Sequence, residues 1–228
     1  MSPEASTPVL YQFFNSVASE MVRISFNLKK AQYIKENIDF TVGQNKSQEY
    51  IKINPTSYIP AIKVGDQVIG EFTAILEYIE EAYSYSPHLL PPIPDFLGRA
   101  RVREILSITA TSYLPEYRAV TYLKEEGDAL VKLFQDTFEN SIRPLEAIIS
   151  QSSGVYSIKD TVSAADIALF VMVNSYLRVG CNLSSYPSVV KVYRNLSKIP
   201  EFIEGSWYSQ PECPENEKAA KDSGYLGH

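Results

Sequence analysis

The sequence predicts an α/β domain followed by an all-helical domain. The first part of the chain mixes strand and helix periodicities, whereas the rest reads as helices with short connections. Between them lies a segment with three prolines, which favour an extended connector. We therefore expect domains at residues 1–88 and 98–228, a linker at 89–97, and a polar, flexible tail over 210–228.

The first half of the α/β domain is predicted to run strand, helix, strand. Residues 8–14 are apolar and rich in β-formers. Asn15 and Ser16 are good N-cap residues for a helix over 17–32. Residues 38–42 alternate apolar and polar side chains, which predicts a half-buried strand.

The second half of this domain is predicted to run strand, strand, helix. Residues 61–64 and 67–69 flank the pair 65–66, Gly-Asp, which suits a tight hairpin turn. Apolar residues over 75–83 mark one face of a helix that should end before Pro87.

The second domain shows several helix signals. Residues 102–106 begin a helix interrupted at Pro115, and apolar residues over 130–149 recur at helical spacing. Further helices are expected to begin at Pro187 and Pro200, since proline costs little in a first turn.

The sharpest local signal is a capping box. Ser163 can cap a helix while Asp166, three residues later, reaches back to it. Residues 167–173 are apolar without interruption, so this helix should lie at the centre of the helical domain.

Composition excludes several classes of protein. The longest apolar run is far shorter than the roughly 20 residues of a membrane helix, so we expect a soluble protein. A net charge of −6 gives no basic footprint for nucleic acid. His88 and His228 are the only histidines and no cluster has metal-ligand spacing, so no metal site is expected. The N-terminus lacks the pattern of a secretory signal, which predicts a cytoplasmic protein.

Four ordered motifs carry a family resemblance. They are LYQFFNS (10–16) leading to 22–24, Asn54-Pro55 followed by YIPA (58–61), Gly70-Glu71 with AILEYIEE (74–81), and DTVSAAD (160–166). Together they resemble the cytosolic glutathione transferase family, most closely its zeta class, which includes maleylacetoacetate isomerase. The resemblance implies a thioredoxin-like N-terminal domain, an all-α C-terminal domain, glutathione as cofactor and a homodimer.

The resemblance implies a catalytic role for Ser16. Its hydroxyl would donate a hydrogen bond to the glutathione sulfur and favour the thiolate. A helix N-terminus and a nearby donor both stabilise an anion, which is a physical reason independent of the family. The alternative is that Ser16 only caps its helix.

Four further residues are implied in binding glutathione. Ile59-Pro60 matches the family's cis-proline, which presents the backbone of Ile59 to the cysteinyl part; the alternative is a trans proline that opens a strand. Glu71 would pair with the ammonium of the γ-glutamyl end. Phe72 stands where the family has Ser or Thr, so only its backbone N–H could hold the γ-glutamyl carboxylate.

Substrate contacts are implied for Arg178, Tyr113 and Tyr117. Arg178 matches the zeta-class arginine that receives a substrate carboxylate, although it could equally be an exposed helix arginine. The two tyrosines would line the electrophile pocket, and core packing is their alternative role. Val17 and Ala18 replace a serine and a cysteine of the zeta signature, which makes maleylacetoacetate a doubtful substrate.

The leading hypothesis is a glutathione-dependent enzyme that acts on an olefin conjugated to a carbonyl. Thiolate addition, bond rotation and elimination would give cis–trans isomerisation; stable addition would give conjugation. The substrate is expected to be bulkier or less acidic than a small diacid, with specialised metabolism as one hypothesis. The alternative is a non-catalytic interaction or dimerisation module. Thiol–disulfide exchange is set aside because residues 15–18 contain no cysteine.

Overall fold

The computed structural model describes the whole chain except residues 1–5, 86, 116–127, 179 and 223–228. Contacts among the residues divide the chain into two compact units. Unit 1 comprises residues 1–87 and 200–219, and unit 2 comprises residues 88–199 and 220–228. Residues 200–219, which the sequence grouped with the helical domain, thus belong to the first unit.

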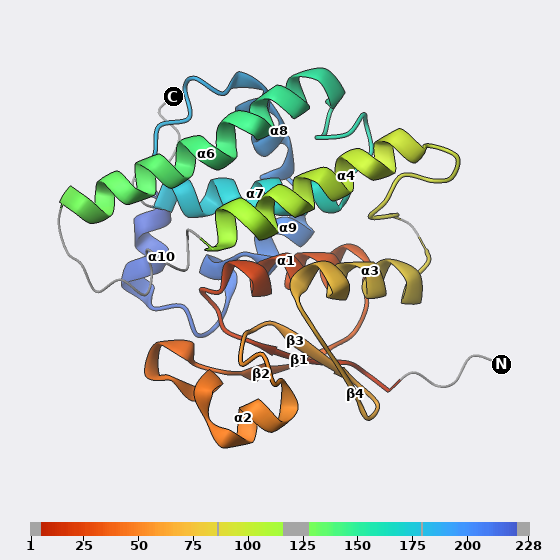
Figure 1. The fold of residues 1–228 in the computed structure, drawn as a ribbon, viewed down its shortest axis with the longest axis vertical. Helices are drawn as coiled ribbons and strands as arrows, with labels where there is room; N and C mark the ends of the chain where they lie inside the picture. The colour runs from red at the N-terminus through yellow and green to blue at the C-terminus, as the bar shows by residue number, and fades with distance from the viewer. Residues whose placement is uncertain (1–5, 86, 116–127, 179, 223–228) are drawn as a thin grey trace. The chain divides into compact units, whose positions relative to one another are not determined.

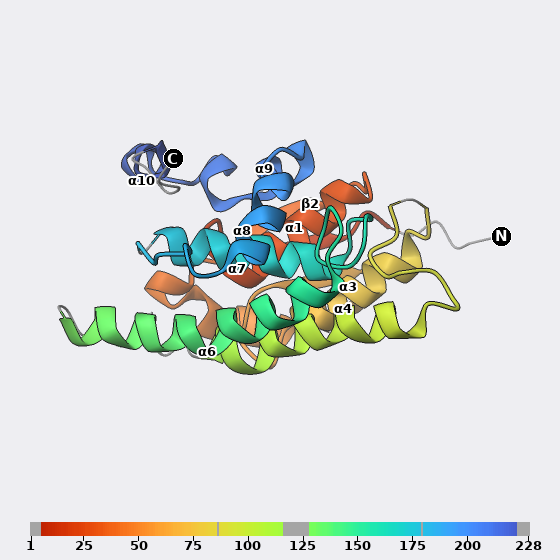
Figure 2. The ribbon, with the colours of Figure 1, turned by 90° about the horizontal axis from the view of Figure 1, so that it is seen from above.

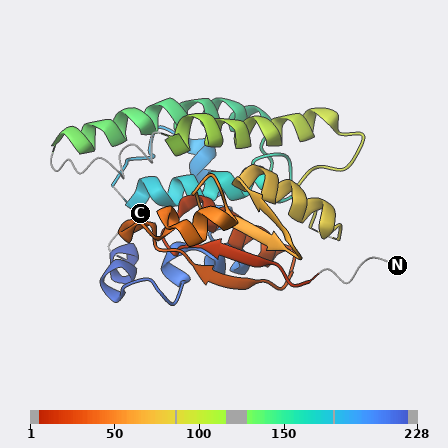
Figure 3. The same ribbon diagram turned by 60° about the horizontal axis from the view of Figure 1, so that its bottom comes forward.

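Unit 1 is built on a four-stranded mixed sheet with the strand order β2-β1-β3-β4 (Figure 3). The strands are β1 (Val9–Gln12), β2 (Ile34–Asn37), β3 (Ala61–Val64) and β4 (Gln67–Gly70). β1 pairs in parallel with β2 and antiparallel with β3, and β3 and β4 form the predicted hairpin. The predicted α/β character of this part of the chain is confirmed.

The second strand lies earlier in the sequence than the predicted residues 38–42. β2 ends at Asn37, and residues 40–42, expected in a strand, form a 3₁₀ turn (η1, Phe40–Val42). The Asp39 carboxylate accepts a hydrogen bond from the Thr41 amide at 2.9 Å. Gly43 then takes the left-handed region with a φ of 81°. Local turn chemistry therefore overrides the alternating pattern.

Unit 1 also contains several short helices. They are α1 (Val17–Leu28), α2 (Gln48–Ile53), α3 (Phe72–Ala82) and α9 (Pro200–Gly205), with short turns η2 (Gln44–Lys46) and η4 (Trp207–Ser209). Of these, α3 packs against β3 and β4. Almost every residue of α1 is buried, because α3 and α9 both pack against it. A helix covered on both sides has no solvent face, which explains its imperfect amphipathic pattern.

Unit 2 is helical, and its helices α4 and α6 lie side by side (Figures 1 and 2). Its helices are α4 (Phe96–Ile108), the π-helical turn η3 (Thr109–Tyr113), α6 (Asp128–Ser152), α7 (Ala164–Arg178) and α8 (Pro187–Leu196). α4 begins inside the expected linker, because the Asp95 carboxylate caps it through the Gly98 amide at 3.0 Å. The regular helix ends at Ile108, before the interruption expected at Pro115.

One half of the capping box predicted for α7 is confirmed: Asp166 reaches back to Ser163, whose hydroxyl donates to the Asp166 carboxylate, while the Asp166 amide donates to the Ser163 backbone carbonyl at 3.1 Å. The Asp166 carboxylate accepts hydrogen bonds from the Ser163 amide at 2.8 Å and from the Ser163 hydroxyl at 2.9 Å. Its second oxygen accepts from the Ser157 amide at 2.7 Å. The apolar residues 167–173 are all buried, so α7 is the core helix that the sequence predicted. The helix starts at Pro187 and Pro200 are also confirmed.

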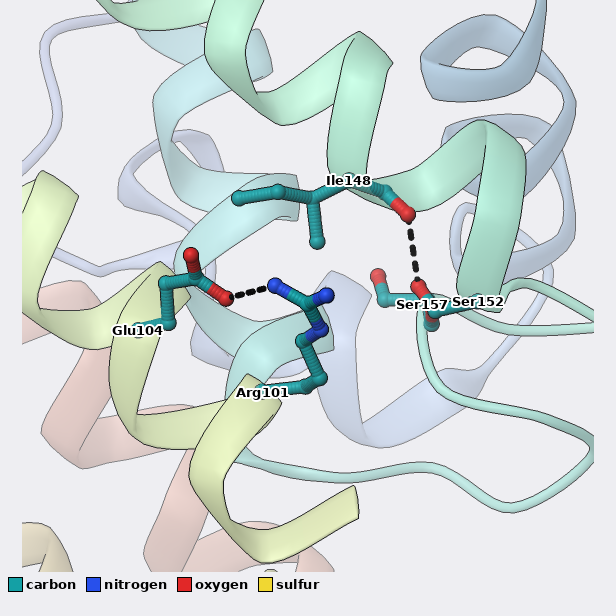
Figure 4. Close-up of polar contacts among 5 residues, drawn as sticks. All are labelled: Arg101, Glu104, Ile148, Ser152 and Ser157. Carbon is teal, nitrogen blue, oxygen red and sulfur yellow. Dashed lines mark hydrogen bonds and ion pairs between the residues drawn. The ribbon is translucent and has the colours of Figure 1, made fainter. Parts of the chain in front are cut away.

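Figure 4 shows two local polar contacts of unit 2. On α4, Arg101 and Glu104 form an ion pair at 2.5 Å. At the end of α6, the Ser152 hydroxyl lies 3.0 Å from the Ile148 carbonyl oxygen and 2.8 Å from that of Ser157. The exposed ion pair adds little stability, whereas the serine ties the following loop to the helix end.

The C-terminal segment is packed where a mobile tail was expected. Gln210 and Cys213 are buried, with 1 % and 3 % of their surface exposed. The Gln210 amide donates to the carbonyls of Glu204 and Ser206, both at 2.9 Å. The last helix, α10 (Glu215–Asp222), follows this packed stretch. Burial and the hydrogen bonds of Gln210 therefore tie residues 210–213 to unit 1.

Candidate functional site

Three of the predicted glutathione-binding positions lie at the same end of the sheet. The end of β1 pairs with Ala61, the first residue of β3, and Ala61 pairs in turn with the last residue of β4. Ser16 follows β1, Pro60 directly precedes β3, and Glu71 directly follows β4. The strand topology of unit 1 therefore gathers residues that are far apart in the sequence.

Ser16 is the N-cap of α1. Its backbone is extended, with φ −76° and ψ 114°, and its hydroxyl oxygen accepts a hydrogen bond from the Ser19 amide at 3.3 Å. Its carbonyl accepts the first helical hydrogen bond, from the Glu20 amide at 2.9 Å. A hydroxyl that accepts an N–H through a lone pair keeps its own proton to donate. Capping and donation to a thiolate are thus compatible at this residue.

Two polar atoms near Ser16 are buried without a hydrogen-bond partner among the described residues. They are Oδ1 of Asn15 and Oγ of Ser19. Buried polar atoms are nearly always paired with protein or ordered water, so these two atoms can hydrogen-bond to a polar ligand or a water molecule at the start of α1. The sequence reasoning missed both as site residues. Their signal was polar side chains at the start of a helix whose other positions are mostly apolar.

The Ile59-Pro60 peptide bond is cis, as predicted. Both residues are buried. The carbonyl of Tyr58, directly before them, accepts hydrogen bonds from the Tyr50 hydroxyl and the Asn54 amide, each at 2.8 Å. Burial raises the pKa of Tyr50 to about 12, so its hydroxyl stays protonated and donates at neutral pH. These two donors hold the chain at the entry to the cis-proline.

The start of α3 presents backbone N–H groups with no side-chain cap. Glu71, at the N-cap, is exposed and makes no capping hydrogen bond; its φ is 57°. Phe72 is only 3 % exposed and lies on the buried side of the helix with Ile75 and Ile79. The first amides of a helix lack intrahelical acceptors and attract anions. Phe72 can therefore contribute its amide to a ligand, while its ring serves the core.

Two of the predicted substrate residues, Tyr113 and Arg178, lie in unit 2. The third, Tyr117, falls outside the described residues. Tyr113 is fully buried: its hydroxyl donates to the Ser175 hydroxyl at 2.6 Å, and its ring meets the ring of Tyr176 edge-on. Arg178 is the last residue of α7 and is partly exposed. Tyr113 has the features of a packing residue, and a substrate role for all three stays a prediction.

The described residues contain neither a candidate metal site nor a candidate membrane-spanning helix. No group of three or more His, Cys, Asp or Glu side chains there could hold a metal ion. No helix in this part of the chain has both the length and the apolar character needed to cross a membrane.

Comparison with protein-family models decides the family. The N-terminal domain of glutathione S-transferase matches residues 6–81, and the C-terminal domain of glutathione S-transferase matches residues 114–204. The chain belongs to the glutathione S-transferase family. The resemblance seen in the sequence motifs and the predicted two-part fold of this glutathione S-transferase are both confirmed.

Relatives of this glutathione S-transferase match nearly its whole length. Maleylacetoacetate isomerase of Rattus norvegicus is 33 % identical over 92 % of this chain and 97 % of the relative. A holo structure of maleyl pyruvate isomerase, described as a bacterial zeta-class glutathione S-transferase, has a TM-score of 0.83 at 28 % identity and covers 90 % of this chain and 100 % of its own. Maleylacetoacetate isomerase from Anaeromyxobacter dehalogenans, with glutathione bound in the active site, has a TM-score of 0.81 at 26 % identity and covers 91 % and 98 %.

Proposed function

We propose that this glutathione S-transferase is a glutathione-dependent enzyme that acts on a carbon–carbon double bond conjugated to a carbonyl group. Cis–trans isomerisation is the preferred reaction, because relatives named maleylacetoacetate isomerase align over nearly the whole chain. The observation that carries the proposal is the Ser16 hydroxyl, which caps α1 and keeps a proton to donate.

The residues at this end of the sheet fit glutathione. The Ser16 hydroxyl and the start of α1 suit the sulfur, and the backbone of Ile59 at the cis-proline suits the cysteinyl part. Glu71 is exposed and able to pair with the ammonium group. The uncapped amides at the start of α3, that of Phe72 included, suit the γ-glutamyl carboxylate.

When bound, glutathione supplies a thiolate that adds reversibly to the activated double bond. Ser16 donates a hydrogen bond to the sulfur, and the positive end of α1 favours its ionised form. Arg178 offers a guanidinium for a carboxylate or for negative charge on the carbonyl oxygen. Val17 and Ala18, in place of serine and cysteine, favour an electrophile bulkier or less acidic than a small diacid. One hypothesis is that this electrophile is a specialised metabolite.

A homodimer in the cytoplasm completes the proposal. The cytosol maintains thiols such as glutathione in reduced form, and two-fold dimers are the commonest closed assembly. Light scattering of the purified protein should therefore give about twice the chain mass of 25.6 kDa. A mass of a single chain would remove the dimer from the proposal.

A non-catalytic interaction module is the second candidate. The buried Phe72 ring, at a position where the family has a hydroxyl, favours it. The two candidate functions differ in what they require of Ser16, because an interaction module needs no hydroxyl donor beside a glutathione sulfur.

The deciding experiment is calorimetric titration of reduced glutathione into the wild type and Ser16→Ala. The matched control is Ser47→Ala, because Ser47 caps α2 through the same contact, its hydroxyl accepting from the Tyr50 amide at 3.1 Å. Each protein is then assayed by NMR for isomerisation and by mass spectrometry for conjugation of a panel of cis enones.

We expect the wild type and Ser47→Ala to bind glutathione and turn over a member of the panel. Ser16→Ala should lower turnover about 100-fold, the order found when one donor to a reacting anion is removed. No glutathione binding by the wild type at millimolar concentration would favour the interaction module. Equal turnover by the wild type and Ser16→Ala would remove Ser16 from the mechanism.

A further inference from the structure

A fully buried arginine lies in the middle of α1. Arg23 has 0 % of its surface exposed, and its guanidinium donates to four oxygen atoms. Nε donates to the Gly205 carbonyl at 2.8 Å, and Nη2 donates to the Phe14 carbonyl at 3.0 Å. Nη1 donates to Oε1 of Gln12 at 2.6 Å and to the Phe13 carbonyl at 3.2 Å. Two of the four acceptors, the carbonyls of Phe13 and Phe14, thus belong to the loop between β1 and α1, and a third, Oε1 of Gln12, belongs to the last residue of β1.

This loop leads directly to Ser16. The Phe13 carbonyl accepts a hydrogen bond from the Ser16 amide at 3.2 Å as well as the one from Arg23. Ser16 and Arg23 are seven residues apart on α1, so at 1.5 Å per residue about 10 Å separates them along the helix axis. Arg23 therefore reaches Ser16 through the loop carbonyls and not by touching a ligand at its hydroxyl.

The fourth acceptor comes from the C-terminal segment, residues 200–213. Its helix α9 packs against α1 (Figure 1). A Cβ atom at Gly205 would lie 2.4 Å from Cγ1 of Ile24, so only glycine allows the approach that brings this carbonyl to Arg23. A second link between the two helices, from the Asn27 amide to the Glu201 carbonyl at 3.2 Å, does not involve the loop.

The same segment is also tied to the edge of the sheet. The Gln12 amide donates to the side-chain oxygen of Asn37 on β2, and the Asn37 amide donates to the Glu212 carboxylate at 2.6 Å. Nearby, the Lys35 ammonium donates to Oε1 of Gln210 at 2.9 Å. These contacts join Arg23, the end of β1, the edge strand and the C-terminal segment in one network.

Side chains enclose the loop as well. Phe14 is buried in a cluster with Trp207 and Cys213, against which Phe13 and Tyr208 pack. Phe13 and Phe14, the two loop residues whose carbonyls accept from Arg23, thus have their rings packed against the C-terminal segment. The loop, Arg23 and the C-terminal segment therefore pack together next to Ser16.

The buried charge of Arg23 suits a geometric role. Burial lowers the pKa of Arg23, and the negative fields of Glu20 and Glu212 oppose this effect; an arginine stays charged in either case. Its four acceptors are three backbone carbonyls and one amide oxygen. A planar fork with several donors can hold all of them at once, which the point charge of a lysine cannot.

We propose that Arg23 is a positioning residue for Ser16, and that the C-terminal segment completes this support through Gly205. The inference rests on the proposed function, because it assigns Arg23 to the activation of glutathione. It predicts that the guanidinium fork, and not merely a positive charge, keeps the Ser16 hydroxyl in place for the sulfur.

The test compares Arg23→Lys with Asn27→Ala in the full-length protein. The second variant is a matched control, because it breaks an α1–α9 contact without touching the loop. Urea unfolding gives the stability of each protein. Ultraviolet difference spectra against pH give the pKa of the bound glutathione thiol, and steady-state kinetics separate kcat from KM.

We expect Arg23→Lys to move the pKa of the bound thiol upward, toward that of free glutathione. It should also lower kcat/KM about 10- to 100-fold, mainly through kcat, as small misplacements of a reacting group do. Asn27→Ala should lose stability while the pKa of the bound thiol stays unchanged. If Arg23 had a purely structural role, Arg23→Lys would give the same result.

The outcomes separate the two proposals. If the wild type shows no bound thiolate, the proposed function fails and the role of Arg23 fails with it. If the wild type ionises glutathione and Arg23→Lys does so equally well, the function stands and the inference is overturned. Should Arg23→Lys not fold, Asn37→Ala on the exposed strand β2 removes the partner of Gln12 instead. A raised thiol pKa then supports the inference, and an unchanged one overturns it.

Discussion

Ser16 accepts one hydrogen bond and keeps one proton, and this property of a hydroxyl lets one side chain serve both the helix and a ligand. The sequence predicted the cap from residue type alone, because Asn15 and Ser16 precede a helical pattern. It could not show that Oδ1 of Asn15 would be buried without a partner in the described structure. That observation depends on what the rest of unit 1 packs around the loop.

Cys181 allows a prediction about pH. Burial raises the pKa of its thiol to about 11. Because the folded-state pKa lies above the usual value, the reactive thiolate appears only as the pH rises toward 11. At pH 8 iodoacetamide should label Cys181 about 100-fold more slowly than a free cysteine, since the thiolate is the nucleophile.

Mass spectrometry of tryptic peptides after timed labelling measures this rate, and the urea-unfolded protein is the control. Labelling of Cys181 at the same rate in the folded and unfolded protein would contradict the prediction. A slow rate also means that this thiol will not compete with glutathione for electrophiles in the assays above.

Among the secondary-structure elements, the predictions that depend on residues close together in the sequence are confirmed. The hairpin of β3 and β4, the caps of α1 and α7, and the proline starts of α8 and α9 are of this kind. The strand expected at residues 38–42 was wrong, because Asp39 and Gly43 form turns that the alternation does not reveal.

The cap of α7 gives a prediction at this scale. Asp166→Ala would leave three buried donors on Ser157 and Ser163 without their acceptor. We expect a loss of about 2–3 kcal/mol in the free energy of unfolding, measured with urea, because unpaired buried groups retain their desolvation cost.

Asp160→Ala is the matched control for this change. Asp160 is exposed and accepts from one backbone amide, that of Val155 at 2.8 Å. Its removal should cost about 1 kcal/mol or less. If the two alanine variants lose equal stability, the capping box does not hold the core helix as described.

At the scale of the whole molecule, the chain returns to unit 1 after building unit 2. Residues 200–213 cover α1 and the loop before Ser16, with Phe202, Trp207 and Cys213 buried. Nothing in their local sequence distinguishes them from the preceding helices. Their place is decided by which apolar surface remains uncovered on unit 1.

Two truncations test this arrangement. A chain that ends at Ile199 loses every buried residue of the C-terminal segment, whereas one that ends at Pro214 keeps them. Each large apolar side chain contributes about 1.5–3 kcal/mol when buried, so the shorter chain should lose most of a typical stability. Thermal unfolding followed by circular dichroism measures both; equal melting temperatures would show that unit 1 folds without the segment.

Motifs and neighbouring residues were enough to predict the family, the order of most elements, the cis-proline and the position of Ser16 at a helix start. Three features became visible only in the tertiary structure. Phe72 belongs to the core, the Tyr113 hydroxyl donates to Ser175, and Arg23 is buried with its guanidinium on the loop before Ser16. The physical reason is that burial and hydrogen-bond partners come from distant segments. Gly205 meets Arg23 across most of the chain length, a contact that no local pattern records.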